Sequence, residues 1–499
     1  SIEADTMINC WNLFISNDIL ENIVVHTNKK INKNKAASND STRKPAEATN
    51  ECEIRAFIGL LYGRGLLNMN HQDYTLLFKE SIGHPVFGAA MSSGRFGYLH
   101  ANITFDDIST RENRFVHDRF AAIREIFEKF NDNCSKALQP DAYLSLDEMI
   151  YGCKNLNSFK QYNSKKPGKY GILLKSINAV NYPYTFRAVV HAGKPTGDPG
   201  PYYVPGIAPT VKRLITDLLT YVDLEGRNIT MDRLYTSIEI IDWLLTKNVT
   251  VVGTVMANKK GIPNELKKTQ GRIPNSYKVF WEADNGKLTL HSYVVQTKSK
   301  GLKNVLALSS MPSLLGITED DGKDKPAILK FYDFSKGGTG IVGQQTESYT
   351  VNTKSRGWTM AVFSYMLDVA RINAQTICSM QKQLDPRKTL SFNFGWEIVM
   401  CLITPQLYRR KTMHGMPTST IRKINVVLNV PDENPTPNEA FPTHNNARKR
   451  CATCSKMNYG PGYMDACSKI PKVTNQCTRC GKAVCKAHIV VQHCKNCTH

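Results

Sequence analysis

The sequence predicts a multidomain α/β protein with a helical N-terminal region, a mixed-sheet core and a C-terminal zinc module. Three observations support this class. The 499 residues exceed what one hydrophobic core usually holds, at roughly 150 residues per domain. Strand-like and helix-like patterns alternate between residues 142 and 255, which favours a mixed sheet flanked by helices. Eight of the 14 cysteines crowd the last 49 residues.

Composition and charge exclude several other classes. Apolar residues make up 41% of the chain and charged residues 21%, which is typical of a folded protein and not of a disordered one. No apolar run has the length of a membrane span, so we expect no membrane partner. The net charge of +21 favours a nucleic-acid partner, although a basic protein with another role remains the alternative.

The first 140 residues are expected to be mainly helical. Apolar residues recur at helical spacing in residues 10–31, 54–67 and 116–130. The polar stretch 33–50 lacks a large apolar residue and is expected to be an exposed loop.

The core is expected to begin at residue 141. Strands are expected at 142–151, 170–180, 184–190, 228–232 and 249–255, and helices at 211–224 and 237–247. Residues 278–308 are expected to form further strands in a separate small unit, and a helix is expected at 358–379. Four prolines between residues 431 and 442 indicate a linker to the tail.

The tail carries four pairs of metal-ligand residues, each pair two residues apart. The predicted ligands are Cys451, Cys454, Cys477, Cys480, Cys485, His488, Cys494 and Cys497. Two such pairs close one tetrahedral structural zinc site, so the tail should hold two Zn²⁺ ions. The short gaps between the last three pairs favour an interleaved cross-brace, in which the first pair joins the third and the second joins the fourth.

Two alternatives remain for this tail. A disulfide cluster could use the same cysteines in an oxidising compartment. Cys467, His493 and His499 are left over, and either histidine could replace an assigned ligand. Both sites are expected to be fully ligated, which indicates structural rather than catalytic zinc.

Two acids end predicted strands of the core. Asp147 lies in the first strand, and Asp232 follows the strand that begins at residue 228. Carboxylates brought together at a sheet edge suit a pair of Mg²⁺ or Mn²⁺ ions that promote phosphoryl transfer. The alternative is that each Asp caps a helix or turn.

A basic segment surrounds the first acid. Residues 149–197 contain eight basic residues, no acid and several interleaved aromatic residues, a pattern that suits a nucleic-acid backbone. An ordinary solvated strand face is the alternative. The predicted DNA-contacting residues are Lys154, Lys160, Lys165, Lys166, Lys169, Arg448, Lys449 and Arg450.

The order of several motifs resembles the piggyBac-type transposases and the cellular proteins derived from them. The matching stretches are Leu146-Asp147-Glu148, Lys166-Pro167-Gly168-Lys169-Tyr170-Gly171, Asn228 to Asp232 with Tyr235-Thr236-Ser237, Val252-Gly253-Thr254-Val255 with Ile262-Pro263, and Phe331-Tyr332-Asp333 with Lys336-Gly337-Gly338. The Cys-rich tail also matches. Together these features cover nearly the whole chain.

The resemblance implies an RNase H-like core that is split by a mainly β insertion. It implies a helical region for dimerisation and DNA binding at 1–140, a core at 141–256 and 331–400, the insertion at 257–330, a helical segment with the linker at 401–447 and a zinc domain at 448–499. It also implies a nuclear homodimer that binds the terminal repeats of double-stranded DNA. Family members cut and paste DNA through hairpin intermediates at TTAA targets, with Asp147 and Asp232 matching two of three catalytic acids.

The third catalytic site departs from the family pattern. Where the family has two acids after the Lys-Gly-Gly motif, this chain has Gly340 and Gly343. The nearby acids Asp333 and Glu347 are poor replacements, because metal-ligand distances tolerate only a few tenths of an ångström. The hypothesis is therefore a transposase-like protein that binds DNA and cleaves it poorly, with its enzymatic activity left open.

Two other functions remain possible on the sequence. One is a domesticated, catalytically inactive DNA-binding or chromatin protein. The other is a zinc cross-brace that recruits another protein.

Overall fold

The computed structural model describes most of the first 430 residues and a few residues of the tail. The described ranges are 6–37, 47–154, 157–164, 166, 168–282, 286–297, 301–311, 313–320, 323–353, 357–430, 449–451, 472–473, 483, 485, 489–490 and 493–494. The chain forms two compact units, Ser1–Leu428 and Asn429–His499, which are described separately.

The N-terminal part of the first unit is helical. Its helices are α1 (Met7–Asn12), α2 (Asn17–Ala37), α3 (Glu51–Leu66), the 3₁₀ helix η1 (Tyr74–Phe78), α4 (Pro85–Ala90), α5 (Ser93–Asn102), α6 (Arg111–His117) and α7 (Arg124–Ala137). Helix α2 extends to Ala37, beyond the expected start of the polar loop at residue 33. Residues 38–46 of that expected loop lie outside the described residues.

Two of the expected helices are each divided in the structure. The pattern at residues 10–31 forms α1 and α2, and the pattern at 116–130 spans the end of α6 and part of α7. Asp118 explains the second break, because its carboxylate accepts a hydrogen bond from the backbone N–H of Phe120 at 2.9 Å. Such a local side-chain bond favours a turn over a continuous helix.

The centre of the unit is one mixed sheet of nine strands. The strands are β1 (Tyr143–Gly152), β2 (Gln161–Tyr162), β3 (Tyr170–Ala179), β4 (Thr185–Val190), β5 (Asn228–Met231), β6 (Thr250–Thr254), β7 (Tyr277–Trp281), β8 (Thr289–Thr297) and β9 (Gly301–Ser309). Their order is β2-β3-β1-β5-β6-β9-β8-β7, with β4 paired to β3. Strand β1 is antiparallel to β3 and parallel to β5, and β5 is parallel to β6.

The strands expected to stand apart are hydrogen-bonded to the core sheet. Residues 252–254 of β6 pair antiparallel with residues 307–309 of β9, and β9 continues through β8 to β7. We expected the strands of residues 278–308 to form a separate small unit, whereas in the structure they belong to the same sheet as the core strands. Only the short hairpin β10 (Ile317–Asp320) and β11 (Lys323–Pro326) forms another sheet within this unit's described residues.

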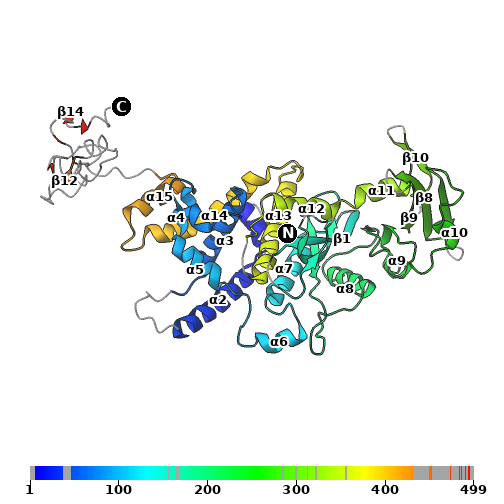
Figure 1. The fold of residues 1–499 in the computed structure, drawn as a ribbon, viewed down its shortest axis with the longest axis horizontal. Coiled ribbons are helices and arrows are strands. Elements are labelled where there is room, and N and C mark those ends of the chain that lie inside the picture. The colour runs from blue at the N-terminus through cyan, green and yellow to red at the C-terminus, as the bar shows by residue number, and fades with distance from the viewer. Residues whose placement is uncertain are drawn as a thin grey trace, which may run out of the picture. The chain divides into compact units, whose positions relative to one another are not determined.

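Helices cover both faces of the sheet. The helices that follow β4 along the chain are α8 (Ile207–Leu219), α9 (Ile238–Leu245), α10 (Asn264–Lys267), α11 (Ala327–Ser335), α12 (Gly338–Ser348), α13 (Trp358–Gln381), α14 (Ser391–Lys411) and α15 (Thr418–Leu428). Figure 1 shows α12 and α13 on one side of the sheet and α8 and α9 on the other. Helix α13 is buried along nearly its whole length and forms the centre of the main hydrophobic core.

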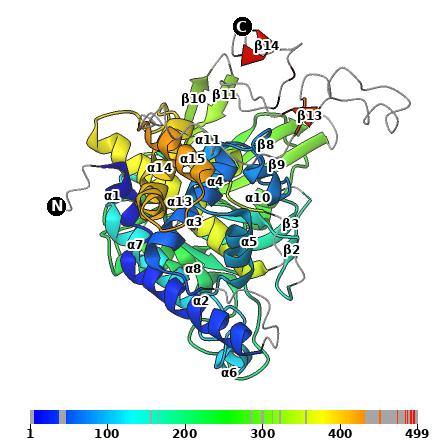
Figure 2. The ribbon, with the colours of Figure 1, turned by 90° about the vertical axis from the view of Figure 1, so that its left-hand side faces the viewer.

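Helices from distant parts of the sequence pack together at the helical end of this unit. Helix α14 packs against α3, and α15 packs against α4. Figure 2 shows these four helices beside one another. None of the helices among the described residues is long and apolar enough to cross a membrane.

The second unit contains two two-stranded antiparallel sheets among its described residues. Strand β12 (Lys449–Arg450) pairs with β13 (Lys472–Val473), and β14 (Ile489–Val490) pairs with β15 (His493–Cys494). The expected Pro-containing linker lies outside the described residues.

A buried carboxylate ties the sheet to α13. The Asp368 side chain, on α13, accepts hydrogen bonds from the hydroxyls of Tyr151 and Thr350, both at 2.6 Å, and from the backbone N–H of Val351 at 2.9 Å. The guanidinium of Arg371 is buried one turn further along α13. Since Asp368 is fully buried, removing it leaves three donors and one cation without their anion.

We expect Asp368→Ala to lower the free energy of unfolding by about 3–5 kcal/mol, the usual cost of breaking a buried charged network. Asp368→Asn, which keeps the shape and part of the hydrogen bonding, should cost less. Urea denaturation followed by circular dichroism measures both values. A loss for Asp368→Ala no larger than that for Asp368→Asn would contradict the role assigned to the carboxylate.

The same group should make stability depend on pH. Burial raises the pKa of Asp368 to about 6 from an ordinary value of 3.8, while Arg371 and the hydrogen bonds oppose this shift. The folded chain therefore holds a proton between about pH 4 and 6 that the unfolded chain has released. Its contribution of roughly 3 kcal/mol is present below pH 4 and is lost as the pH rises to 6. Denaturation at several pH values should show this slope in the parent chain and a smaller slope in Asp368→Asn.

Candidate functional site

The two predicted acids lie side by side on neighbouring strands, but only Asp232 follows a strand end; the prediction is wrong for Asp147, which lies in the middle of β1. Strands β1 and β5 run parallel, and their register pairs Leu146 with Met231. Asp147 and Asp232 are the next residues on the two chains, so the structure brings together the side chains that the sequence placed at separate strand ends.

A lysine lies against the first acid. The Lys166 Nζ atom is 3.8 Å from Asp147 Oδ2 and 3.7 Å from Glu148 Oε1, and it donates a hydrogen bond of 2.6 Å to the Glu148 carbonyl. Burial raises the pKa of Asp147 to about 7, with Lys166 lowering it and Glu148 raising it. The sequence had assigned Lys166 to DNA contact, whereas here its ammonium neutralises the acidic edge.

Two tyrosines lie beside the second acid. The Tyr332 hydroxyl donates to Asp232 Oδ1 at 3.4 Å. Burial raises the pKa of Tyr332 to about 12, and the nearby carboxylates of Asp232 and Asp147 add to the shift. Burial also raises the pKa of Tyr235, again with help from Glu148, Asp147 and Asp232. Both phenols are therefore protonated at neutral pH and can act only as neutral hydrogen-bonding groups.

One carboxylate oxygen at this site has no partner. Glu148 Oε2 and the Tyr235 hydroxyl are buried and lack a hydrogen-bond partner among the described residues. The two groups nevertheless interact with each other, because the Glu148 carboxylate helps to raise the pKa of Tyr235.

Helix α12 forms the opposite wall of the acidic edge. Its first residue, Gly338, must be glycine for steric reasons, because an added Cβ would lie 2.4 Å from the Ala179 carbonyl oxygen and 2.6 Å from Ser145 Oγ. A Cβ at Gly340 or Gly343 would meet no atom within 4 Å. Packing therefore requires glycine at the first of these positions and not at the other two.

A cavity of about 240 Å³ lies between α12 and the strand edge. It is lined by Asp147, Glu148, Met149, Ile150, Lys166, Thr339, Gly340, Gly343, Gln344 and Glu347. Both glycines thus line the same cavity as the first acid. Among the described residues no group of three or more His, Cys, Asp or Glu side chains is arranged to hold a metal ion.

The two acids near the glycines differ in position. Glu347 lines this cavity. Asp333 does not, and its carboxylate is instead paired with Lys325 and Lys336. Of these two acids, Glu347 is the one that lines the same cavity as Asp147.

The predicted basic surface is found in part. Lys154 and Lys169 are exposed, and the Lys160 Nζ atom lies 5.9 Å from the centre of the Tyr170 ring. The rings of Tyr162 and Tyr170 lie next to each other across β2 and β3, tilted by 34° with centres 4.5 Å apart, and each side chain is more than half exposed. We call the set of Lys154, Lys160, Lys169, Tyr162 and Tyr170 the hairpin surface. Lys165 and Arg448 lie outside the described residues, and only the backbones of Lys449 and Arg450, in β12, are described.

Two of the predicted zinc ligands can be placed. Cys451 and Cys485 are both buried, and the backbone N–H of Cys485 points to Cys451 Sγ at 3.3 Å. They belong to the first and third ligand pairs, which the cross-brace assigns to one ion. The backbone of Cys494 lies in β15. Cys454, Cys477, Cys480, His488 and Cys497 lie outside the described residues.

Comparison with known proteins decides the family. A family model described as Transposase IS4 matches residues 6–375, which is most of the chain. The chain belongs to the piggyBac-type transposase family. Its fold is similar to the solved piggyBac transposase synaptic complex with hairpin DNA, with a TM-score of 0.78, 27% sequence identity and coverage of 99% of this chain and 98% of that chain.

Two human relatives are similar over a shorter region. PiggyBac transposable element-derived protein 3 is 20% identical over 335 residues, or 64% of this chain and 54% of the relative. PiggyBac transposable element-derived protein 2 is 24% identical over 344 residues, or 67% of this chain and 57% of the relative. This piggyBac-type chain therefore matches little more than half the length of these relatives.

Several contacts at this piggyBac-type site were not predicted from the sequence. Lys166 reaches Asp147 because the chain folds back between β1 and β3, and nothing in its local pattern indicates that contact. Tyr332 was part of a motif without an assigned role. Thr339 positions α12, because its backbone N–H donates to Ser145 Oγ at 3.1 Å and its hydroxyl accepts from Asn178 at 2.8 Å.

Proposed function

We propose that this piggyBac-type chain binds DNA as a transposase relative but cleaves it poorly. The observation that carries the proposal is the cavity in which Gly340 and Gly343 face Asp147 without a side chain. The similarity of the whole fold to a transposase solved with hairpin DNA supports the DNA-binding part. The lack of a carboxylate at Gly340 and Gly343 of α12 supports the impaired cleavage.

The residues present do not fit the two-ion site that the family resemblance implies. A pair of divalent cations needs several carboxylates to offset its charge. Here Asp147 and Asp232 remain, the α12 positions provide none, and the Lys166 ammonium lies 3.8 Å from Asp147. A fixed cation at that distance competes with a metal ion for the same carboxylate, so we derive no metal-dependent step for the unaltered chain.

Several finer properties belong to the same proposal. The strand order β4-β3-β1-β5-β6, antiparallel and then parallel, supports the RNase H-like core. The contact between Cys451 and Cys485 supports a zinc cross-brace in the tail. The homodimer and the nuclear location follow from the family alone.

Cleavage is tested with a supercoiled plasmid that carries the terminal repeats of the element, incubated with the full chain and Mg²⁺ or Mn²⁺. We expect binding of the repeats, compared with a plasmid whose repeats are scrambled, and no nicked or hairpin-ended product. Efficient excision by the unaltered chain would show that the two glycines do not impair the reaction.

The hairpin surface provides the test of DNA contact. Lysines that neutralise phosphates release counterions, so each should add about 1 to the slope of log affinity against log salt. We expect Lys160→Ala and Lys169→Ala each to lower that slope by about 1. Lys212→Ala is the matched control, because Lys212 lies on α8 and its ammonium is paired with the carboxylate of Glu239, on α9, at 2.7 Å. Equal slopes for all three variants would exclude the hairpin surface as a phosphate contact.

A further inference from the structure

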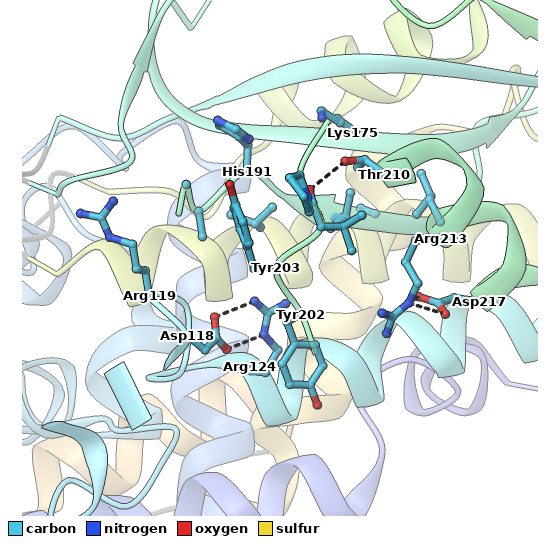
Figure 3. Close-up of a pocket in the computed structure, with 18 of the residues that line it drawn as sticks. Asp118, Arg119, Arg124, Lys175, His191, Tyr202, Tyr203, Thr210, Arg213 and Asp217 are labelled. Atoms are coloured by element: carbon cyan, nitrogen blue, oxygen red, sulfur yellow. Dashed lines mark hydrogen bonds and ion pairs between the residues drawn. The ribbon is translucent and has the colours of Figure 1, made fainter. Parts of the chain in front are cut away.

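The cavity beside α7 and α8, of about 260 Å³, contains acids that are paired with neighbouring guanidinium groups (Figure 3). Asp118 accepts two hydrogen bonds from Arg124, at 2.8 and 2.9 Å, and Asp217 accepts two from Arg213, both at 2.8 Å. No cysteine is among the residues that line this cavity. The thiol side chains of the first unit therefore lie outside it, and two of them contact each other.

These two cysteines meet where α1 packs against α13. Cys10 lies on α1 and Cys378 in the last turn of α13, and the two are not joined by a disulfide. Cys10 is fully buried and Cys378 is 4% exposed. The Cys10 thiol is within hydrogen-bond reach of two acceptors on α13, the Cys378 sulfur and Gln381 Oε1, the second at 3.6 Å. Since residues three apart share one face of a helix, both contacts place the Cys10 sulfur over the end of α13.

The residue after Cys10 holds α1 in this position. Trp11 is fully buried, and its Nε1 atom donates to the Tyr62 hydroxyl at 2.9 Å. That hydroxyl donates to the backbone carbonyl of Leu367, on α13, at 2.6 Å. Because these bonds tie α1 to α3 and α13, the two sulfurs are kept together without a covalent link.

The two sulfurs differ in acidity. The hydrogen bond from Cys10 lowers the pKa of Cys378 to about 6, against the effect of burial and with help from the Lys382 ammonium. The same hydrogen bond and burial raise the pKa of Cys10. At neutral pH the pair therefore holds a thiolate at Cys378 and a thiol at Cys10. A thiolate beside a cation and a second thiol is the arrangement that oxidants convert to a disulfide.

The pair lies directly beneath the surface at the end of α13. Gln381 and Lys382, the two polar side chains that contact these sulfurs, belong to residues that are both exposed. A small hydroperoxide can reach the Cys378 sulfur when these flexible side chains move aside.

We propose that Cys10 and Cys378 form a reversible oxidation site, at which a hydroperoxide converts the two thiols into a disulfide that links α1 to α13. This inference is independent of the proposed function, because neither DNA binding nor cleavage has been assigned to these residues.

With hydrogen peroxide as the oxidant, the reaction has two steps. The Cys378 thiolate attacks one oxygen, so that an S–O bond forms, the O–O bond breaks, and the leaving hydroxide takes a proton from solvent. The Cys10 sulfur then attacks the Cys378 sulfur, so that the S–S bond forms, the S–O bond breaks, and the leaving hydroxide takes the Cys10 proton. Two thiols and one peroxide thus give one disulfide and two water molecules, and a dithiol such as dithiothreitol reverses the change.

The first experiment treats the full chain with hydrogen peroxide, blocks the remaining thiols with iodoacetamide under denaturing conditions, and maps the tryptic peptides by mass spectrometry. We expect a linked pair of peptides that contains Cys10 and Cys378 and that dithiothreitol separates. Cys134, buried on α7, and Cys401, exposed on α14, are internal controls that should join no other cysteine of the first unit. If Cys10 and Cys378 are still fully alkylated after Cys401 has been oxidised, the proposal is wrong.

The second experiment tests the order of the two steps. In Cys10→Ser the oxidation should stop at the sulfenic acid of Cys378, which dimedone labels. In Cys378→Ser the Cys10 side chain should remain a thiol. Equal labelling of the remaining cysteine in the two variants would overturn the proposed order of attack. Circular dichroism confirms that each variant is folded, and the peptide map of the parent chain needs neither of them.

The third experiment tests the nearby cation. Lys382→Met should slow the oxidation of Cys378 by roughly 3–10-fold, because it removes a positive charge that favours the thiolate. Lys388→Met is the matched control, because Lys388 lies beyond the end of α13 and is paired with Asp385 at 3.7 Å. Equal rates for the two variants would contradict the role of Lys382.

The disulfide should also stabilise the fold, because it constrains the unfolded chain between residues 10 and 378. We expect peroxide to raise the midpoint of thermal unfolding of the parent chain by roughly 5 °C and to leave that of Cys10→Ser unchanged. An equal shift in both chains would show that the linkage is not its cause. None of these measurements requires DNA.

Discussion

The Gly340→Asp, Gly343→Asp double variant is expected to cleave DNA at the terminal repeats when Mg²⁺ or Mn²⁺ is added. The new carboxylates would enter the α12 cavity, where an added Cβ at either position meets no atom within 4 Å. They would also face Asp147, which lines the same cavity. Restoring a lost catalytic interaction is worth about 4 kcal/mol, so we expect a gain of roughly 1,000-fold in the rate of nicking.

The Gly340→Asn, Gly343→Asn double variant is the matched control. It has the same size as the aspartate variant and lacks only the negative charge, so it should bind the repeats without cutting them. Adding Asp147→Asn to the aspartate variant should abolish the gain. If the aspartate variant binds DNA and Mn²⁺ but produces no nick, the impairment lies elsewhere in the molecule.

The tail is expected to bind about two zinc ions per chain and to lose its fold when they are removed. Structural zinc contributes roughly 10–16 kcal/mol to the folding of small modules, more than a core of this size provides. Chelation should therefore abolish the circular dichroism and protease resistance of the tail. An unchanged tail after complete removal of zinc would contradict this.

The contact between Cys451 and Cys485 sharpens the zinc prediction. If both bind the same ion, Cys451→Ser and Cys485→Ser should each leave about one zinc ion, and the double variant should also leave about one. If they belong to different sites, the double variant should retain none. Cys401→Ser is the control, because Cys401 is exposed on α14 in the other unit. Elemental analysis of the purified full chain gives the count.

The sequence predicts the strands of the core well because their hydrophobic patterns are local. The expected strand at 142–151 is β1, at 143–152, and the expected strand at 249–255 is β6, at 250–254. The break between α6 and α7 was missed because it depends on one hydrogen bond, which the Asp118 carboxylate accepts from the backbone N–H of Phe120. The pairing of β6 with β9 was missed because it joins residues more than 50 positions apart, which no local pattern specifies.

The candidate site also contains some contacts that could be predicted from the sequence and others that could not. The proximity of Asp147 and Asp232 follows from the parallel pairing of β1 and β5, in which the end of β5 is level with the middle of β1. The ammonium of Lys166 beside Asp147 could not be predicted, because its position depends on how residues 153–169 fold back.

The continuous sheet has a mechanical consequence. Because residues 252–254 of β6 are hydrogen-bonded to residues 307–309 of β9, strands β7–β9 cannot swing about a flexible hinge without breaking that ladder. A pull applied at the edge strand β7 is transmitted through β8, β9 and β6 to β5, whose end carries Asp232. We therefore expect a displacement of strand β7 to move Asp232 at the end of β5 as well.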